Sequence, residues 1–172
     1  MKVRDLNRTE CLKLLRDARL GRIACARDGQ PYVVPFSFAY DEGDHLYGFS
    51  TVGQKIEWMR ENPKVCIEVE DISDKQNWTT LVIFGLYEEL EDIEEFEEER
   101  AKARELLGKS PTWWQPAYFV GVARGEFEEV PVFFRVKIVK ITGHHSYNEN
   151  FEKLIPQGQP ESLKRKRIRG LW

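Results

Sequence analysis

The chain has 172 residues, enough for one domain with a buried core, and its composition is that of a globular protein rich in aromatic side chains. Its net charge of −3 argues against a protein that binds nucleic acid through bulk positive charge. Three cysteines without paired metal-ligand spacing favour reduced thiols, and no segment has the pattern of a membrane span or a signal peptide. We therefore expect a cytoplasmic protein that contacts neither a membrane nor a nucleic acid.

The first elements expected along the chain are a helix and a strand. Asn7, followed three residues later by Glu10, is a variant of the capping box that starts a helix. We expect Gly21 to end this helix, because glycine is common just beyond helix C-termini. Residues 22–27 then alternate between apolar and charged or small side chains, which predicts a strand.

The dipeptide Asp28-Gly29 predicts a tight hairpin turn, because both central positions of a type I′ turn need a positive φ. An extended run follows at residues 31–40, and after a turn at 41–44 a second strand is expected at 45–50. Pro35 lies inside the extended run and cannot donate a backbone hydrogen bond. It indicates either a sheet edge or a place where something other than a strand lies alongside.

The junction between the strand at 45–50 and the next predicted helix, 54–62, has the chemistry of a phosphate-binding site. Ser50 and Thr51 supply hydroxyls at the start of the helix, and Lys55 lies one turn inside it. Free N–H groups at a helix start, hydroxyls and an ammonium group suit a phosphate. The same pattern is typical of an ordinary capped helix start, so the residues alone leave both interpretations open.

Two further strands are expected at residues 65–71 and 78–90. Gly85 lies inside the second of them and predicts a bulge or a bend. Thr79 and Thr80 at its start are residues that favour strands, and their hydroxyls either face solvent and neighbouring strands or face a ligand.

An acidic helix is predicted at about residues 93–107. Nine of the twelve positions from 88 to 99 are acidic, which is typical of a solvated helix face near the positive end of the helix dipole. Trp113 and Trp114 follow in a loop between prolines. Paired aromatic residues in a rigid loop fill a core edge or a subunit interface more often than they contact a ligand.

A last strand is expected at residues 131–142. Together the strands and helices predict a mainly β fold, a split antiparallel β-barrel with helices packed outside it. We expect one domain over residues 1–147, followed by a C-terminal extension, 148–172, with a basic cluster at 164–169. Such a tail is either a solubilising segment or a contact for an anionic partner.

No set of residues for catalysis or metal binding is visible in the sequence. There is no nucleophile elbow, and His144 and His145 are adjacent, so on a strand they point to opposite faces and chelate poorly. A phosphate site without an acid–base set fits a cofactor that brings its own chemistry. The sequence therefore identifies no catalytic residue, and we predict no metal site.

Several short motifs also occur in a familiar order. They are Gly21-Arg22-Ile23-Ala24, Asp28-Gly29-Gln30-Pro31-Tyr32-Val33-Val34-Pro35, Leu46-Tyr47, Gly53-Gln54-Lys55-Ile56, Asn62-Pro63-Lys64-Val65-Cys66, Phe84-Gly85 and Ile141-Thr142-Gly143. In these motifs the chain resembles the pyridoxamine 5′-phosphate oxidase-like family of FMN-binding split barrels, in the branch that includes the nitroimidazole-resistance proteins. The resemblance covers about residues 6–146.

The resemblance implies a homodimer with two FMN sites at the subunit interface, each lined by both chains, and a small-molecule substrate. Carried over by position, Lys55 would hold the flavin phosphate together with Ser50, Thr51 and Gln54. The positions that would line or approach the flavin are Val34, Pro35, Phe36, Ser37, Phe49, Trp78, Thr79, Thr80, Trp113 and Trp114. Relatives in the nitroimidazole branch often carry a histidine at the position of Phe49, and this departure argues against nitroimidazole reduction.

The function expected from the sequence is that of an FMN-binding flavoprotein, an FMN-dependent oxidoreductase of the pyridoxamine 5′-phosphate oxidase-related type. One alternative is a non-catalytic protein that stores or senses flavin or haem on the same barrel. Another is a reductase that uses deazaflavin F420 in place of FMN. The sequence names neither the substrate nor the electron donor.

Overall fold

The computed structural model describes residues 1–109 and 131–147. The elements in chain order are β1 (Lys2–Asp5), α1 (Arg8–Asp17), β2 (Leu20–Arg27), β3 (Gln30–Ser37), β4 (Ala39–Tyr40), β5 (His45–Ser50), α2 (Gln54–Glu61), β6 (Lys64–Ile72), β7 (Trp78–Glu89), the 3-10 helix η1 (Glu94–Phe96), α3 (Glu97–Gly108) and β8 (Val132–Tyr147). The predicted Trp113 and Trp114 loop and the C-terminal extension lie outside the described residues.

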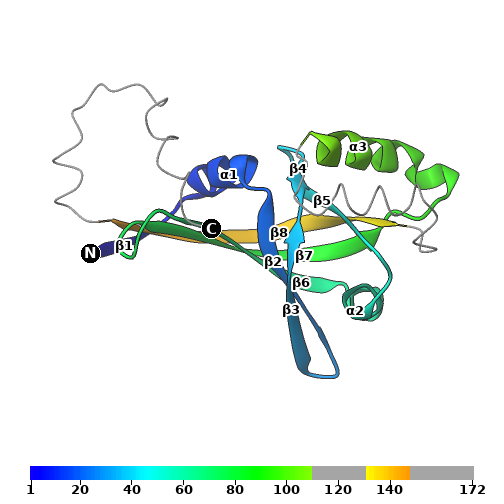
Figure 1. Ribbon diagram of the computed structural model, residues 1–172, viewed down its shortest axis with the longest axis horizontal. Helices are drawn as coiled ribbons and strands as arrows, with labels where there is room; N and C mark the ends of the chain where they lie inside the picture. The colour runs from blue at the N-terminus through cyan, green and yellow to red at the C-terminus, as the bar shows by residue number, and fades with distance from the viewer. Residues whose placement is uncertain (110–130, 148–172) are drawn as a thin grey trace.

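The described strands form one antiparallel sheet in the order β3-β2-β6-β7-β8-β5-β4, with β1 paired to β8 (Figure 1). The two ends of this order, β3 and β4, are consecutive in the chain and are separated only by Phe38. The sheet therefore has to curl until its edges approach each other, and β3 and β5 are in contact across the curl. The predicted fold, a split antiparallel barrel with helices outside it, is confirmed.

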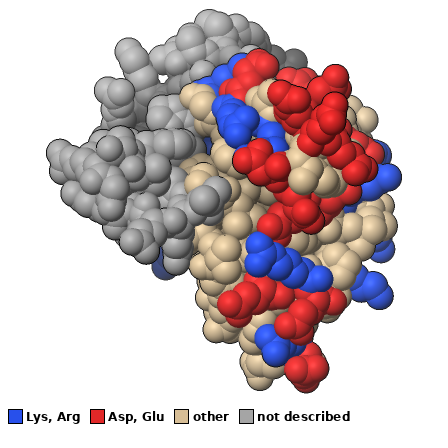
Figure 2. Space-filling view, turned by 90° about the vertical axis from the view of Figure 1, so that its right-hand side faces the viewer, with Lys and Arg blue, Asp and Glu red and all other residues tan. Residues whose placement is uncertain are grey.

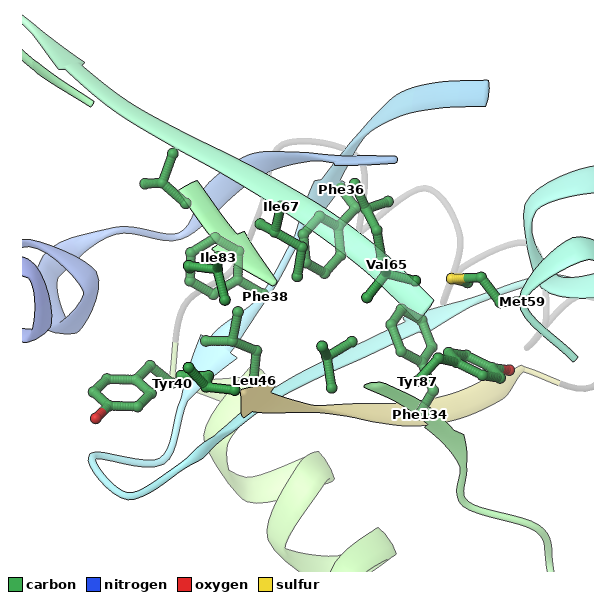
Figure 3. Packing of buried hydrophobic residues seen from close by; sticks show 14 of the residues in the cluster. Phe36, Phe38, Tyr40, Leu46, Met59, Val65, Ile67, Ile83, Tyr87 and Phe134 are labelled. Atoms are coloured by element: carbon green, nitrogen blue, oxygen red, sulfur yellow. The ribbon is translucent and has the colours of Figure 1, made fainter. Parts of the chain in front are cut away.

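The core lies inside the curled sheet. Side chains from all strands from β2 to β8, together with α1 and α2, form its main cluster, and aromatic rings such as Phe36, Phe38 and Phe134 point toward one another in it (Figure 3). A second cluster, which includes Phe49 and Phe133, lies between the sheet and α3. The adjacent Phe133 and Phe134 are therefore both buried, on opposite faces of β8.

The start of α1 is as the sequence predicts, but its end is not. Asn7 and Glu10 form the complete capping box, with Glu10 N donating to Asn7 Oδ1 at 3.0 Å and Asn7 N donating to Glu10 Oε2 at 2.9 Å. The helix ends at Asp17, and Gly21 lies inside β2. A Cβ atom at Gly21 would lie 2.7 Å from the carbonyl oxygen of Glu68, so glycine is needed there for close strand packing.

The strands β7 and β8 form the longest pairing of the sheet. The predicted irregularity at Gly85 is confirmed, because the register shifts between Phe84 and Gly85. β8 runs to Tyr147, beyond the predicted end at 142, because β7 pairs with it as far as Ser146 and β1 pairs with it on the other side as far as Tyr147. β1 is short and exposed, and no local pattern in residues 2–5 predicts it.

The acidic helix forms in two parts. η1 precedes α3, and α3 covers the outer face of β5 and β8 near the position that the sequence predicts. Arg100 of α3 is buried, contrary to the usual exposure of arginine. Its Nη1 donates to the carbonyl oxygen of Leu90 at 2.9 Å, and its Nη2 lies 3.2 Å from a carboxylate oxygen of Asp92.

Candidate cofactor site

The junction between β5 and α2 has the geometry of an anion-binding helix start. Ser50 ends β5, and Gly53 is the N-cap of α2 in extended backbone conformation. No side chain caps this helix start. Since the first N–H groups of a helix have no partner within the helix, they are free to donate to an anion. The structure thus differs from the ordinary side-chain-capped start that the sequence left open.

Lys55 lies half-buried one residue into α2. Burial lowers the pKa of its ammonium group, and the nearby thiol of Cys25 on β2 opposes this shift. Among the described residues, no carboxylate pairs with Lys55. A desolvated cation without an anionic partner is costly, and a phosphate bound at the start of α2 would compensate it.

The four predicted residues on β3 divide between the two faces of the strand. Phe36 and Val34 face the core, where Phe36 is buried and Val34 packs against the main cluster. Pro35 and Ser37 therefore face the other way, because successive side chains on a strand alternate. β3 is an edge of the sheet, which explains the tolerance of Pro35. That a cofactor lies along this edge stays a prediction.

Ser37 is a buried polar side chain that lacks a partner. It is 5 % exposed, and its Oγ has no hydrogen-bond partner, the one such buried side-chain oxygen or nitrogen in residues 1–109 and 131–147. A buried hydroxyl without a partner costs free energy, so a native structure normally satisfies it. A flavin with its many acceptor and donor atoms fits this unsatisfied group, as its phosphate fits Lys55.

The predicted segment at the start of β7 is divided in the same way. Thr79 faces inward and its Oγ1 lies 3.0 Å from Nδ1 of His145 on β8. Trp78 and Thr80 point to the opposite face. This segment lies beside β1 in Figure 1, at the other end of the molecule from α2. Within one chain the structure therefore does not bring it together with Lys55.

Of the three other predicted residues, Phe49 is the one that the structure describes, and it directly precedes Ser50 at the end of β5. Phe49 is buried in the cluster beneath α3, with its ring 6.0 Å from that of Phe133. Trp113 and Trp114 lie outside the described residues. Their contacts with a cofactor stay predictions.

An apolar row, which the sequence pattern does not predict, crosses four strands on the outer face of the sheet. Val33 pairs with Ala24, Ala24 with Cys66, and Cys66 with Phe84, so these four side chains point to one face. Val33 is 59 % exposed and Phe84 is 47 % exposed. Leu86, two residues farther along β7, is 41 % exposed on the same face. Exposed apolar surface of this kind marks interaction sites. These residues are far apart in the sequence, and only the pairing register of the strands shows that they lie together.

The curled, split antiparallel barrel is the fold of a class of flavin-binding proteins. Residues 7–145 match the model of the family described as pyridoxamine 5′-phosphate oxidase. The chain belongs to this family.

Individual relatives agree with this assignment. An uncharacterised protein of Rhizobium meliloti is 39 % identical over 144 residues, which cover 83 % of this chain and 95 % of the relative. The crystal structure of a FAD-binding protein of Mesorhizobium loti matches with a TM-score of 0.71 and 40 % identity, over 86 % of this chain and 99 % of that chain. The FAD and haem binding protein of Mycobacterium smegmatis shares the fold, with a TM-score of 0.56 and 17 % identity over 90 % of this chain and 80 % of that chain.

In the described part of the chain, no helix has the length and apolar character needed to cross a membrane.

Proposed function

We propose that this protein binds a flavin nucleotide and acts as a flavin-dependent oxidoreductase on a small molecule. The observation that carries the proposal is Lys55, a desolvated ammonium group without a carboxylate partner at the uncapped start of α2. The unsatisfied hydroxyl of Ser37 is a second group that a bound flavin would satisfy. The family and the FAD-binding relative from Mesorhizobium loti support the same cofactor class.

The flavin is either FMN or FAD, because each carries the phosphate that the start of α2 would bind. The sequence favours FMN, whereas the relative that is 40 % identical binds FAD. Lys55, Ser50 and Thr51 are proposed to hold the phosphate, with Gln54 beside them. Pro35 and Ser37 on β3 are proposed to lie along the flavin.

A bound flavin supplies the electron-transfer and hydride-transfer chemistry, so few protein groups are required. The proposed roles of the chain's own residues are to neutralise the phosphate, to orient the flavin and to exclude water. Ser37 and Thr80 offer hydroxyls that stay neutral at physiological pH. Substrate choice then depends on the shape of the site more than on a titrating side chain.

We further propose a homodimer in which each flavin site takes residues from two chains. The segment from Trp78 to Thr80 is far from α2 within one chain, and we propose that it approaches the flavin from the partner subunit. A second copy seated on the apolar row would bring its own β7 to the site. The exposed Phe84 and Val33 are the proposed contacts.

The test is the absorption spectrum of the protein purified without added cofactor, followed by release and chromatographic identification of any bound flavin. We expect a flavin spectrum that bleaches when a nicotinamide donor or dithionite is added anaerobically. Turnover of a quinone or nitroaromatic acceptor should show only a shallow pH profile between about 6 and 8, where a histidine would titrate. Protein that binds neither FMN nor FAD on titration would refute the proposal, and flavin that only dithionite reduces would favour a non-catalytic binding role.

A further inference from the structure

An aromatic pair, Tyr32 of β3 and Trp58 of α2, lies beside the proposed phosphate site. Lys55 and Trp58 are three residues apart in α2, so they are neighbours on the surface of the helix. Cys25, the thiol near Lys55, lies directly opposite Tyr32 in the pairing of β2 with β3, and the two side chains share one face. The rings of Tyr32 and Trp58 meet edge to face, with centroids 5.6 Å apart and planes at 60°. Lys55 and the aromatic pair therefore belong to one cluster of side chains.

The aromatic pair lies at the rim of the core. Both rings are half-buried and pack against the main cluster, so part of each ring stays open to solvent. In the part of the chain that the structure describes, nothing accepts a hydrogen bond from the hydroxyl of Tyr32 or from the indole N–H of Trp58. An edge-to-face contact also leaves uncovered the faces of the ring that contributes its edge. The pair thus offers aromatic surface together with two hydrogen-bond donors.

α2 advances toward the turn of the β2–β3 hairpin as it runs along the sheet. Its middle meets β3 at the contact between Trp58 and Tyr32. Its end meets β2, where Asn62 Nδ2 donates to the carbonyl oxygen of Ala26 at 2.9 Å. Ala26 is closer to the hairpin turn than the position of β2 that pairs with Tyr32. The start of α2, with Lys55, therefore lies on the side of the aromatic pair that is farther from the turn.

A ligand whose phosphate is held at the start of α2 can extend from it in two directions along β3. Toward the end of β3 lies Ser37, on the proposed path of the flavin, and it is five residues from Tyr32, about 17 Å along the strand. Toward the hairpin turn lies the aromatic pair. The face that carries α3 is unfavourable for a charged phosphate, because acidic side chains form a broad band on it (Figure 2). A group joined to the far side of the phosphate therefore meets the aromatic pair.

We propose that Tyr32 and Trp58 bind the adenine of FAD and give the protein a preference for FAD over FMN. The inference rests on the proposed flavin-binding function. The diphosphate of FAD stays at Lys55 and the start of α2, and the isoalloxazine extends toward Ser37. Adenine stacks on the open aromatic surface, and its ring nitrogens accept hydrogen bonds from the Tyr32 hydroxyl and the Trp58 indole N–H. FMN ends at its phosphate and makes none of these contacts.

The experiment compares the binding of FAD and FMN to the full-length, flavin-free protein by isothermal titration calorimetry. We expect the native protein to bind FAD at least about tenfold more tightly than FMN, the effect of one stacked base. Trp58→Leu should weaken FAD binding by about tenfold and leave FMN affinity within about twofold. Trp58→Phe is the matched control, because phenylalanine keeps an aromatic face and should retain most of the preference for FAD.

Two further measurements test the adenine contact without relying on one variant. ADP carries adenine and a diphosphate without a flavin, so it should bind the flavin-free protein, compete with FAD and lose affinity in Trp58→Leu. Tyr32→Leu removes the other ring and should also weaken FAD and ADP while sparing FMN. It provides the test if Trp58→Leu does not fold.

The outcomes separate this inference from the proposed function. Equal affinities of the native protein for FAD and FMN would overturn the adenine site while flavin binding stands. Equal losses of FAD and FMN affinity in Trp58→Leu would also overturn it, because Trp58 would then serve only the fold. Failure of both FAD and FMN to bind the native protein would refute the proposed function itself.

Discussion

In the flavin-free protein, burial disfavours the charged form of the Lys55 ammonium group and lowers its pKa. Replacement by methionine keeps the length of the side chain and removes the charge. We expect Lys55→Met to weaken flavin binding by about 1.5–3 kcal/mol, the size of a charge-assisted hydrogen bond. The same change should raise the melting temperature of the flavin-free protein, because a desolvated charge is lost.

Titration calorimetry and thermal unfolding of Lys55→Met measure the two effects. Lys13→Met is the control, since Lys13 is exposed on α1 and should change neither quantity. Unchanged flavin affinity in Lys55→Met would remove Lys55 from the site.

The lowered pKa of Lys55 also predicts how flavin binding depends on pH. A bound phosphate favours the charged ammonium, so binding raises the pKa of Lys55 relative to the flavin-free protein. Affinity should be full below the lowered pKa and should fall as the pH rises through it, because the free protein is then neutral at this position. Titrations at increasing pH, up to the ordinary lysine pKa of about 10.4, measure this decline. In Lys55→Arg the decline should vanish, since arginine stays charged.

Ser37 offers a test that separates binding from stability. Its Oγ has no partner in the described structure, so Ser37→Ala removes an unsatisfied buried group and should leave the stability of the flavin-free protein equal or higher. If the hydroxyl bonds to the flavin, affinity should fall by about 0.5–1.5 kcal/mol. Urea unfolding and flavin titration report the two quantities. Lower stability with unchanged affinity would show that the hydroxyl serves the fold instead.

At the scale of the elements, α1 gives a clear test of a local signal. The Asn7 side chain satisfies the backbone N–H of Glu10, so Asn7→Ala should reduce the free energy of unfolding by about 1 kcal/mol. Thr9→Ala, an exposed change in the first turn that leaves the cap intact, should have a smaller effect. Urea unfolding curves with equal slopes would give the comparison, and equal losses in the two variants would contradict the role of the cap.

The structural features that could be predicted from the sequence are those that depend on residues close together in the chain. The capping box at Asn7, the positive φ of Asp28 and Gly29, and the irregularity at Gly85 are each properties of neighbouring residues. β1 was missed because it owes its strand conformation to pairing with the distant end of β8. The role of Gly21 was misread for the same reason, since the atom that requires a glycine belongs to Glu68 of another strand.

The candidate site was predictable to the same extent. The pattern around Lys55 could be read locally, but its lack of an ion-pair partner depends on the whole fold. Val34, Pro35, Phe36 and Ser37 are consecutive on one strand, so they cannot all face one cofactor. The sequence motif identifies this segment of β3. Which two of its side chains face the core follows only from the pairing of β3 with β2 in the folded sheet.

At the scale of the whole molecule, the apolar row is a surface that one chain leaves open. Val33 and Phe84 lie in the row, and Arg22 forms ion pairs with Glu68 at 3.0 Å and with Glu70 at 2.9 Å beside it. Arg22 lies two residues before Ala24 on β2, so it points to the same face. An apolar centre with a polar border is the usual composition of a protein interface.

The last prediction joins this surface to the flavin. If a second copy covers the apolar row and completes the cofactor site, Phe84→Glu should convert the dimer to a monomer, because it places a charge in the contact. Flavin affinity should fall with it, although Phe84 is far from Lys55 in the chain's own fold. Ile93→Glu is the control, since Ile93 is a comparably exposed apolar residue, at 48 %, near α3 and away from the row. Sedimentation velocity and flavin titration of the two variants measure the effects. A native protein that sediments as a monomer with flavin bound would contradict the shared site, because one chain would then supply every contact that the flavin needs.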